Sequence, residues 1–150
     1  MEKYNSINEE IDALIAHIKE LKGDGEKGLA YEEMCVVART NPILEDYKKA
    51  LENAGIKTYE IRRSKTDDRG MPGVRLATMH RVKGLEFSCM FLVGMNKGNM
   101  PLKKAIETTD EEARKEAIIA ERSLLYVALT RAKKISYVSG YGKMSEFVMA

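Results

Sequence analysis

Two short apolar runs joined by a charged connector constrain this chain more than any other feature. The runs cover residues 74–79 and 87–95, and their Val, Phe, Cys and Met content over so short a length favours buried β-strands. Between them lies the connector (residues 80–86), which contains His80, Arg81, Lys83, Gly84 and Glu86. Because a doubly wound sheet binds its ligands beside the loops at the ends of its strands, the connector is the first candidate site.

The N-terminal segment predicts an amphipathic helix. Apolar residues recur at helical spacing over residues 7–21, Ser6 or Asn8 can cap the first turn, and Gly23 can end the last one. Residues 23–28 then contain three glycines among charged residues, which is the composition of a loop.

A strand, a helix and a second strand are predicted next. Residues 34–38 form a short apolar run that predicts a buried strand. Asn41 as the N-cap, with Pro42 at the first helical position, predicts a helix that ends near Gly55. Residues 57–61 predict the following strand. Such an alternation with short connections indicates an α/β domain, in which helices cover a parallel sheet.

Two polar segments predict loops. Residues 62–73 mix cations with Asp67 and Asp68 and show no apolar period, so the segment is interpreted as a solvated surface loop rather than a nucleic-acid patch. Residues 96–108 predict a second irregular segment.

The C-terminal third predicts one long helix. Thr109 and Glu112 have the spacing of a capping box, and cations at residues 131–134 complement the C-terminal end of a helix. Residues 135–139 predict a further strand. Residues 145–148 predict a helix start cut off by the end of the chain, which suggests a piece of a larger protein.

The composition excludes several classes of protein. Lys and Arg number 25 against 23 Asp and Glu, an excess too small to indicate a polyanionic partner by itself. Cys35 and Cys89 lie in apolar runs without a CxxC pair, which favours buried thiols in a reducing cytoplasm. His17 and His80 offer no zinc-ligand spacing with them. The apolar runs are much shorter than the roughly 18 residues that a membrane span needs.

Three local patterns each have a chemical and a structural interpretation. Lys83, Gly84 and Glu86 could meet a phosphate and a ribose, although an isolated pattern of this kind is more often a charged turn. A lone His80 is more often structural or exposed than catalytic. Arg131 could stabilise charge in phosphoryl transfer, but a cation is common at a helix C-terminus. The residues alone leave these alternatives open.

Taken together, three segments resemble one known family. Residues 78–87 and 121–132 are similar to motifs V and VI of the superfamily 1 DNA helicases of the UvrD/Rep type, in the right order and at a fitting separation. Residues 34–41 resemble the strand that opens the second RecA-like domain of that family. The resemblance implies an α/β, RecA-like three-layer fold with a mainly parallel sheet and helices on both faces. Residues 31–150 would form this motor domain, preceded by an N-terminal helix and Gly-rich loop at 1–30.

The resemblance also implies a nucleotide site. Arg131 matches the arginine finger of motif VI, which in the family reaches the γ-phosphate of ATP bound to the partner domain. Glu86 matches the glutamate of motif V that contacts the ribose, and Lys83 and Gly84 match neighbouring positions that line the nucleotide cleft.

A second group of positions is implied to face single-stranded DNA. Thr78 and His80 match positions of motif V on that side, and Asn41 matches a strand-end asparagine that touches the same strand. Supporting roles are expected for Arg39, Glu121 and Tyr126, the last two behind the arginine finger.

Departures from the family pattern limit what the chain is expected to do alone. The phosphate loop GxxxxGK[ST], the acidic metal-binding motif and the glutamine motif are absent, so ATP and Mg²⁺ would be bound mainly by a separate first RecA-like domain. The large insertion that the family often carries between residues 61 and 74 is reduced to a short loop, as in a compact helicase or a piece cut from one.

The expected partners are therefore single-stranded DNA and the first RecA-like domain of the same protein, with no membrane contact, a monomeric isolated domain and a cytoplasmic location. Two other classes stay open. One is a binding module that grips DNA or protein without ATP turnover, and the other is a degenerate domain that docks onto a nuclease or repair complex.

Overall fold

The apolar runs of the sequence form a six-stranded sheet with the strand order β1-β6-β5-β2-β4-β3. The computed structural model describes residues 1–23, 28–62 and 68–149. All strand pairs in the sheet are parallel. The strands are β1 (Glu2–Tyr4), β2 (Met34–Ala38), β3 (Thr58–Glu60), β4 (Val74–Thr78), β5 (Phe87–Leu92) and β6 (Ala132–Tyr141).

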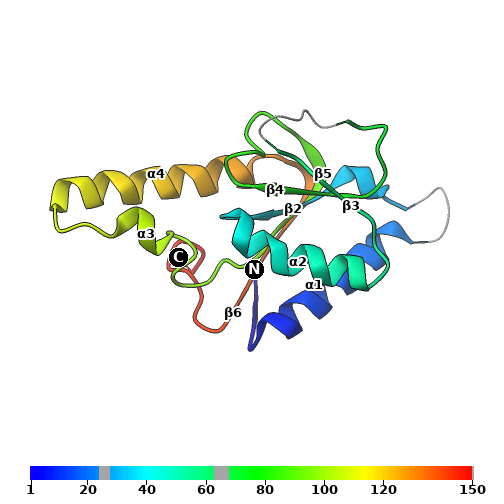
Figure 1. Cartoon of the computed structure of the whole chain (residues 1–150), viewed down its shortest axis with the longest axis horizontal. Coiled ribbons are helices and arrows are strands. Elements are labelled where there is room, and N and C mark those ends of the chain that lie inside the picture. Colours follow the sequence, from blue (N-terminus) through cyan, green and yellow to red (C-terminus); the bar gives the residue numbers. More distant parts are fainter. Residues whose placement is uncertain (24–27, 63–67, 150) are drawn as a thin grey trace.

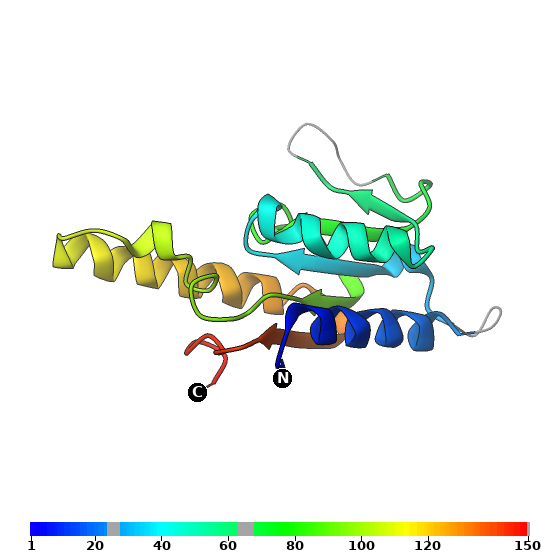
Figure 2. The ribbon, with the colours of Figure 1, turned by 60° about the horizontal axis from the view of Figure 1, so that its bottom comes forward.

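Helices cover both faces of the sheet (Figures 1 and 2). They are α1 (Ile7–Lys22), α2 (Asn41–Asn53), the short α3 (Lys103–Ile106), α4 (Glu111–Leu129) and the 3₁₀ turn η2 (Tyr31–Glu33). Alternate residues of a strand point to opposite faces, so Val36 of β2 packs in the same apolar cluster as α1 and α2, while Val37 packs in the cluster of α4. This arrangement confirms the predicted three-layer α/β fold with a parallel sheet.

The helix α4 extends beyond the sheet at its N-terminal end (Figures 1 and 2). Its buried residues are Glu121, Leu125 and Ala128, all in the second half of the helix. The second half therefore packs on the sheet, and the first half is solvated.

Several predicted boundaries agree with the structure. Ser6 caps α1 and Gly23 ends it, as the helical period indicated. The predicted strand at residues 34–38 coincides with β2. The predicted loop over residues 23–28 falls largely on residues 24–27, which lie outside the described residues.

The N-caps of two helices differ by one residue from the predictions. Thr40, not Asn41, caps α2, because its Oγ1 accepts a hydrogen bond from the Ile43 N–H at 3.5 Å. Asp110, not Thr109, caps α4, and its Oδ1 accepts from the Glu112 N–H at 3.0 Å. In both places adjacent residues can cap, and the backbone geometry selects between them. Asn41 consequently keeps an exposed side chain free of the capping role.

The C-terminal half departs further from the sequence-based expectation. The helix α4 ends at Leu129 rather than at 131–134, because the backbone at Arg131 already pairs with Phe87 at the start of β5. No helix begins at residues 145–148, where residues 146–149 form a turn, and the expected irregular segment at 96–108 contains α3. The strand β1 was not predicted, since only pairing with β6 defines so short a run.

The loop after β3 is exposed where it is described, as expected, but it is also anchored. Arg75 of β4 is fully buried and donates to the carbonyl oxygens of Asp68, Met71 and Gly73 at 2.6–2.9 Å. The cations and the acid predicted to be solvated at positions 63–67 lie outside the described residues.

The remaining general expectations concern the cysteines and membrane spans. Cys35 and Cys89 are both buried, and burial raises the pKa of the Cys89 thiol to about 12. Over residues 1–23, 28–62 and 68–149, the structure contains no helix both long and apolar enough for a membrane crossing.

Candidate functional site

The connector (residues 80–86) runs from the side of the sheet where the strands end to the side where they begin. We call these two sides the carboxyl edge and the amino edge. It leaves the carboxyl end of β4, where Thr78 is aligned with Ala38 at the end of β2. It enters the amino end of β5, where Phe87 is aligned with Ala132 at the start of β6. Because β4 and β5 are parallel, the candidate residues of this stretch separate into two groups at opposite edges.

The first group lines a hollow at the carboxyl edge. This carboxyl-edge hollow has a volume of about 540 Å³ and is lined by Arg39, Thr40, Asn41, Pro42, Thr78, His80 and Arg81. It brings together the three residues predicted to face DNA: Asn41 and His80 are exposed, and Thr78 is nearly buried at 7% exposure. The carboxyl ends of two neighbouring strands and a helix start thus supply polar side chains to one open surface.

A buried ion pair supports this edge. Arg39 donates to the Glu121 carboxylate through Nε at 2.9 Å and Nη2 at 2.7 Å, and the two residues are 8% and 4% exposed. The same carboxylate accepts from the Leu102 N–H at 2.7 Å. A two-pronged guanidinium contact of this kind fixes orientation as well as distance. Glu121 therefore fastens α4 to the end of β2, directly before Thr40.

The second group lies at the amino edge. Arg131 sits between α4 and β6, and its carbonyl oxygen accepts from the Phe87 N–H at 3.0 Å. Its backbone is thereby fixed beside Glu86, whose side chain is exposed. The Arg131 Nε is buried and has no hydrogen-bond partner among the described residues, and Nη2 lies 3.5 Å from Thr130 Oγ1. A buried N–H group of a cation without an acceptor is costly, and an anion brought to it would supply the acceptor.

Lys83 and Gly84 lie on the part of the connector that leads to this edge. Both are exposed, and the turn that carries them is closed by a hydrogen bond from the Leu85 N–H to the Val82 carbonyl at 3.0 Å. Gly84 has φ 84°, a conformation that favours glycine. The pattern Lys-Gly-x-Glu is therefore a tight turn whose polar groups face solvent.

Two residues predicted to support the arginine finger, Glu121 and Tyr126, make no side-chain hydrogen bond or ion pair with Arg131 in the described part of the chain. Glu121 contacts Arg39 and Leu102 rather than the amino edge, and the helix rises about 12 Å from Glu121 to its last residue, Leu129, two residues before Arg131. Tyr126 is 68% exposed. Their predicted role behind the arginine finger stays a prediction, while the carboxyl edge gains Glu121 as a direct support.

Sequence reasoning did not select two residues that the structure places at these edges. Arg81 lines the carboxyl-edge hollow and a neighbouring one of about 370 Å³. Arg69 of the loop after β3 reaches the amino edge, where it donates to the Glu86 carbonyl oxygen at 2.8 Å. Arg81 belongs to the charged connector, and its charge at that position could have marked it as a candidate site residue. The position of Arg69 depends on long-range folding that no local pattern reveals.

Other charged groups have structural roles. The buried Glu10 carboxylate accepts from the Tyr47 hydroxyl, from the Gly94 N–H at 2.9 Å and from the Ser139 hydroxyl at 2.7 Å. Burial and the nearby Glu10 raise the pKa of Tyr47. In the described part of the chain, no three His, Cys, Asp or Glu side chains are grouped as a metal site would require.

Comparison with known proteins bears on the same segments. The family model of the UvrD-like helicase C-terminal domain matches residues 49–143, more than half of the chain. A stretch of 67 residues is 42% identical to the ATP-dependent DNA helicase PcrA of Staphylococcus aureus strain Mu50, and covers 45% of this chain and 9% of PcrA. The match to PcrA of Staphylococcus epidermidis has the same identity and coverage.

The fold is also similar to a solved structure. The C-terminal domain of a possible DNA helicase from Lactobacillus plantarum WCFS1 superposes with a TM-score of 0.67 at 16% identity, over 97% of this chain and 75% of that one. At this identity the likeness concerns the fold alone. The matched stretch is about a tenth of the length of the PcrA relatives, 9%. From its parallel sheet and its match to the family model, the chain belongs to the UvrD-like helicase C-terminal domain family.

Proposed function

We propose that this chain is the C-terminal motor domain of an ATP-dependent DNA helicase or translocase. Its amino edge would complete a nucleotide site held mainly by a first RecA-like domain, and its carboxyl edge would form part of a track for single-stranded DNA. The chain alone would not turn over ATP, because it lacks a phosphate loop.

The observation that carries the proposal is the Nε of the Arg131 side chain, which is unpaired within the described part of the chain. Its Nε is buried without a hydrogen-bond partner among the described residues, although its backbone is fixed by the bond to Phe87. A phosphate oxygen from ATP bound to the partner domain is the acceptor that such a guanidinium fits best. Arg131 would then stabilise negative charge that develops on the transferring phosphoryl group.

The neighbouring groups suit the rest of a nucleotide. The exposed Glu86 carboxylate can accept hydrogen bonds from ribose hydroxyls. The exposed Lys83 can act as a point charge toward phosphate, and Gly84 lets the backbone approach a ligand closely. Mg²⁺ would be held by the partner domain, where it would neutralise phosphate charge.

The carboxyl-edge hollow suits a nucleic-acid strand. Asn41 and His80 offer exposed hydrogen-bonding groups, and Thr78 adds a hydroxyl at its base. Arg81 brings a positive charge for a phosphate. The hollow is open, as a track must be if a strand is to move along it.

The connector links the two sites. It begins beside Thr78 at the DNA edge and ends at Glu86 at the nucleotide edge. A change in how Glu86 and Arg131 engage nucleotide would therefore act on the same short segment that carries His80. Closure of the nucleotide cleft would be converted in this way into movement along the strand.

The test is Arg131→Ala in the complete protein that joins this chain to a phosphate-loop domain. DNA-stimulated ATP hydrolysis should fall about 10³-fold or more, because removal of an arginine finger has effects of that size. Affinity for single-stranded DNA and the thermal unfolding temperature should stay within about twofold and a few degrees of the parent protein.

Lys133→Ala is the matched control, because Lys133 is an exposed cation two residues further along. It should hydrolyse ATP at nearly the parent rate. Normal turnover in the Arg131 variant would sink the motor-domain proposal. DNA binding without any nucleotide turnover in the complete parent protein would instead support the binding-module alternative.

A further inference from the structure

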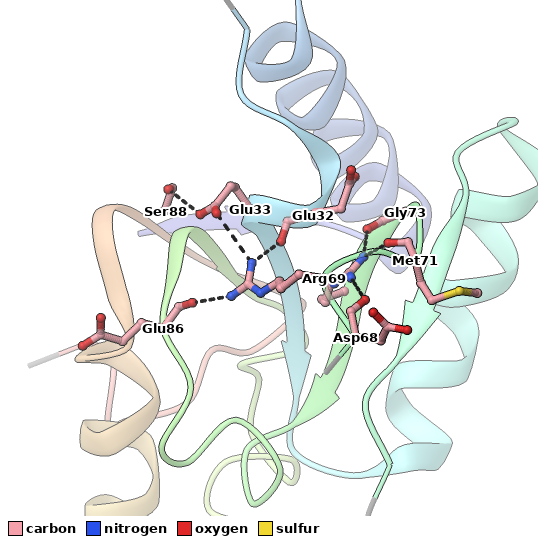
Figure 3. A network of polar contacts seen from close by, with 9 residues as sticks. Glu32, Glu33, Asp68, Arg69, Met71, Gly73, Glu86 and Ser88 are labelled. Carbon is pink, nitrogen blue, oxygen red and sulfur yellow. Dashed lines mark hydrogen bonds and ion pairs between the residues drawn. The ribbon is translucent and has the colours of Figure 1, made fainter. Parts of the chain in front are cut away.

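Arg69 reaches from the loop after β3 to the end of the connector (Figure 3). Its Nη1 donates to the Glu32 carbonyl oxygen at 2.6 Å, and its Nη2 donates to the Glu86 carbonyl oxygen at 2.8 Å. A single guanidinium thus joins η2, which precedes β2, to the residue that precedes β5. Both segments lie at the amino edge of the sheet.

Two further contacts fix the orientation of Arg69. The Glu33 Oε1 lies 3.6 Å from Nη1, and the other Glu33 oxygen accepts from the Ser88 hydroxyl at 2.8 Å. The guanidinium carbon lies 4.6 Å from the centre of the Phe87 ring. Arg69 is therefore held by the Glu33 carboxylate and the Phe87 ring as well as by its two carbonyl acceptors, an arrangement that a lysine could not reproduce.

The loop that carries Arg69 is itself anchored. Arg75 is fully buried and donates to the carbonyl oxygens of Asp68, Met71 and Gly73. These three residues, labelled in Figure 3, bracket Arg69 in sequence. Backbone carbonyls that accept from a buried guanidinium cannot move without breaking charge-assisted bonds. The side chain of Arg69 is thus presented from a fixed base rather than from a free loop.

We infer that Arg69 is a positioning residue for the nucleotide site: it fixes the backbone of Glu86 so that the Glu86 carboxylate is held ready for the ribose. Figure 3 shows that this carboxylate points away from Arg69, while the carbonyl of the same residue accepts its hydrogen bond. The Glu86 side chain is exposed. Arg69 acts on the contact through the main chain and leaves the carboxylate free for a ligand. The inference rests on the proposed function of Glu86.

The arrangement predicts a specific coupling. The backbone on the two sides of the Glu86–Phe87 peptide is held by Arg69 through the Glu86 carbonyl and by Arg131 through the Phe87 N–H. Loss of the Arg69 bonds would let the connector shift at Glu86, while Phe87 stays in the sheet ladder. The ribose contact should weaken, and the arginine finger should be affected less.

The experiment is a double-mutant cycle in the complete protein, with ATP and 2′,3′-dideoxy-ATP as substrates. Glu86→Ala, which removes the acceptor, should reduce the preference in kcat/KM for ATP about fivefold, the value of about one hydrogen bond. Arg69→Ala should reduce the same preference about threefold, mainly through KM. The double variant should lose little more than Glu86→Ala alone, because both changes remove one contact.

Arg69→Lys separates positioning from charge. It keeps the positive charge but lacks the fork that reaches two carbonyl oxygens, so it should behave like Arg69→Ala; it also replaces that variant if the alanine protein does not fold. Arg114→Ala, which removes an exposed arginine from the first turn of α4, is the matched control and should keep the full preference.

The outcomes distinguish the two levels of the proposal. If Glu86→Ala lowers the preference and the Arg69 variants do not, or if the two effects simply add, the positioning role of Arg69 is overturned while the ribose contact stands. If Glu86→Ala leaves the preference unchanged, the ribose contact itself fails, and the inference about Arg69 fails with it.

Discussion

The two edges of the sheet are built in opposite ways. At the carboxyl edge a buried ion pair between Arg39 and Glu121 sits behind the open hollow, with both partners less than a tenth exposed. At the amino edge Arg131 has a buried N–H without an acceptor among the described residues, and the anchoring arginine, Arg69, has a side chain that is 43% exposed. At the carboxyl edge the buried charges are paired with each other, whereas at the amino edge a buried cation keeps one donor without a partner among the described residues.

This difference fits the two proposed ligands. A strand of DNA that slides needs a surface whose shape stays constant, and a buried charge pair satisfied on both sides provides it. A nucleotide that is bound between two domains needs groups that remain unsatisfied until the domains close. The connector, which belongs to both edges, is the part of the chain through which they could communicate.

The largest expected effect concerns the satisfied charge pair. Glu121→Ala should lower the free energy of unfolding by about 3–5 kcal/mol, because it leaves Arg39 buried without its carboxylate. Chemical denaturation measures the change. Glu116→Ala, an exposed acid on the same helix, should change it by less than about 0.5 kcal/mol. Equal effects of the two substitutions would show that the carboxyl edge does not depend on this pair.

A smaller effect is expected from the exposed side of the same edge. Asn41→Ala should weaken binding of single-stranded DNA to the complete protein about fivefold, the loss of about one hydrogen bond. The slope of log K against log salt should not change, because asparagine is neutral, whereas Arg81→Ala should reduce it by about one. Fluorescence anisotropy at several salt concentrations measures both. The control is Asn53→Ala, which changes an exposed asparagine at the other end of α2. An equal loss of affinity in this control would show that the carboxyl-edge hollow is not part of the DNA track.

The smallest effect is a pH dependence at the amino edge. The hydrogen bond from Ser88, with the charges of Arg69 and Lys133 nearby, holds the pKa of Glu33 below its ordinary value of 4.5. A lowered pKa in the folded state adds stability above pH 4.5, and this stability is lost as the pH falls from there through the lowered value. The stability difference between the parent chain and Glu33→Gln should therefore be constant at neutral pH and shrink in acid. A difference that grows in acid would contradict this network.

Much of the fold follows from local patterns. The helical spacing of apolar residues over 7–21 predicted α1, and the apolar run at 34–38 predicted β2. Apolar residues at helical spacing mark a helix with one buried face, and a short continuous apolar run marks a buried strand. The strand β1 and the end of α4 were not predictable in this way. Both depend on pairing with β6 and β5, residues that are remote in sequence or lie across the sheet.

The candidate site, like the fold, has a part that the sequence predicted and a part that it did not. The connector and Arg131 were found from the charged residues at strand and helix ends and from the resemblance that their segments carry together. Residue types and spacing alone left structural alternatives open for each pattern, and only the resemblance of the two motifs together selected these residues as candidates. The sequence by itself therefore determined the α/β class, the family resemblance and the identity of the chemical groups.

Only the tertiary structure decided how those groups are divided. The parallel pairing of β4 and β5 sends the connector across the sheet, so that His80 and Glu86, six residues apart, lie at opposite edges. It also brings Arg39 against Glu121 and Arg69 against Glu86, over separations of 82 and 17 residues. No local propensity encodes such contacts, because they form only when packing of the whole sheet sets the distance between segments.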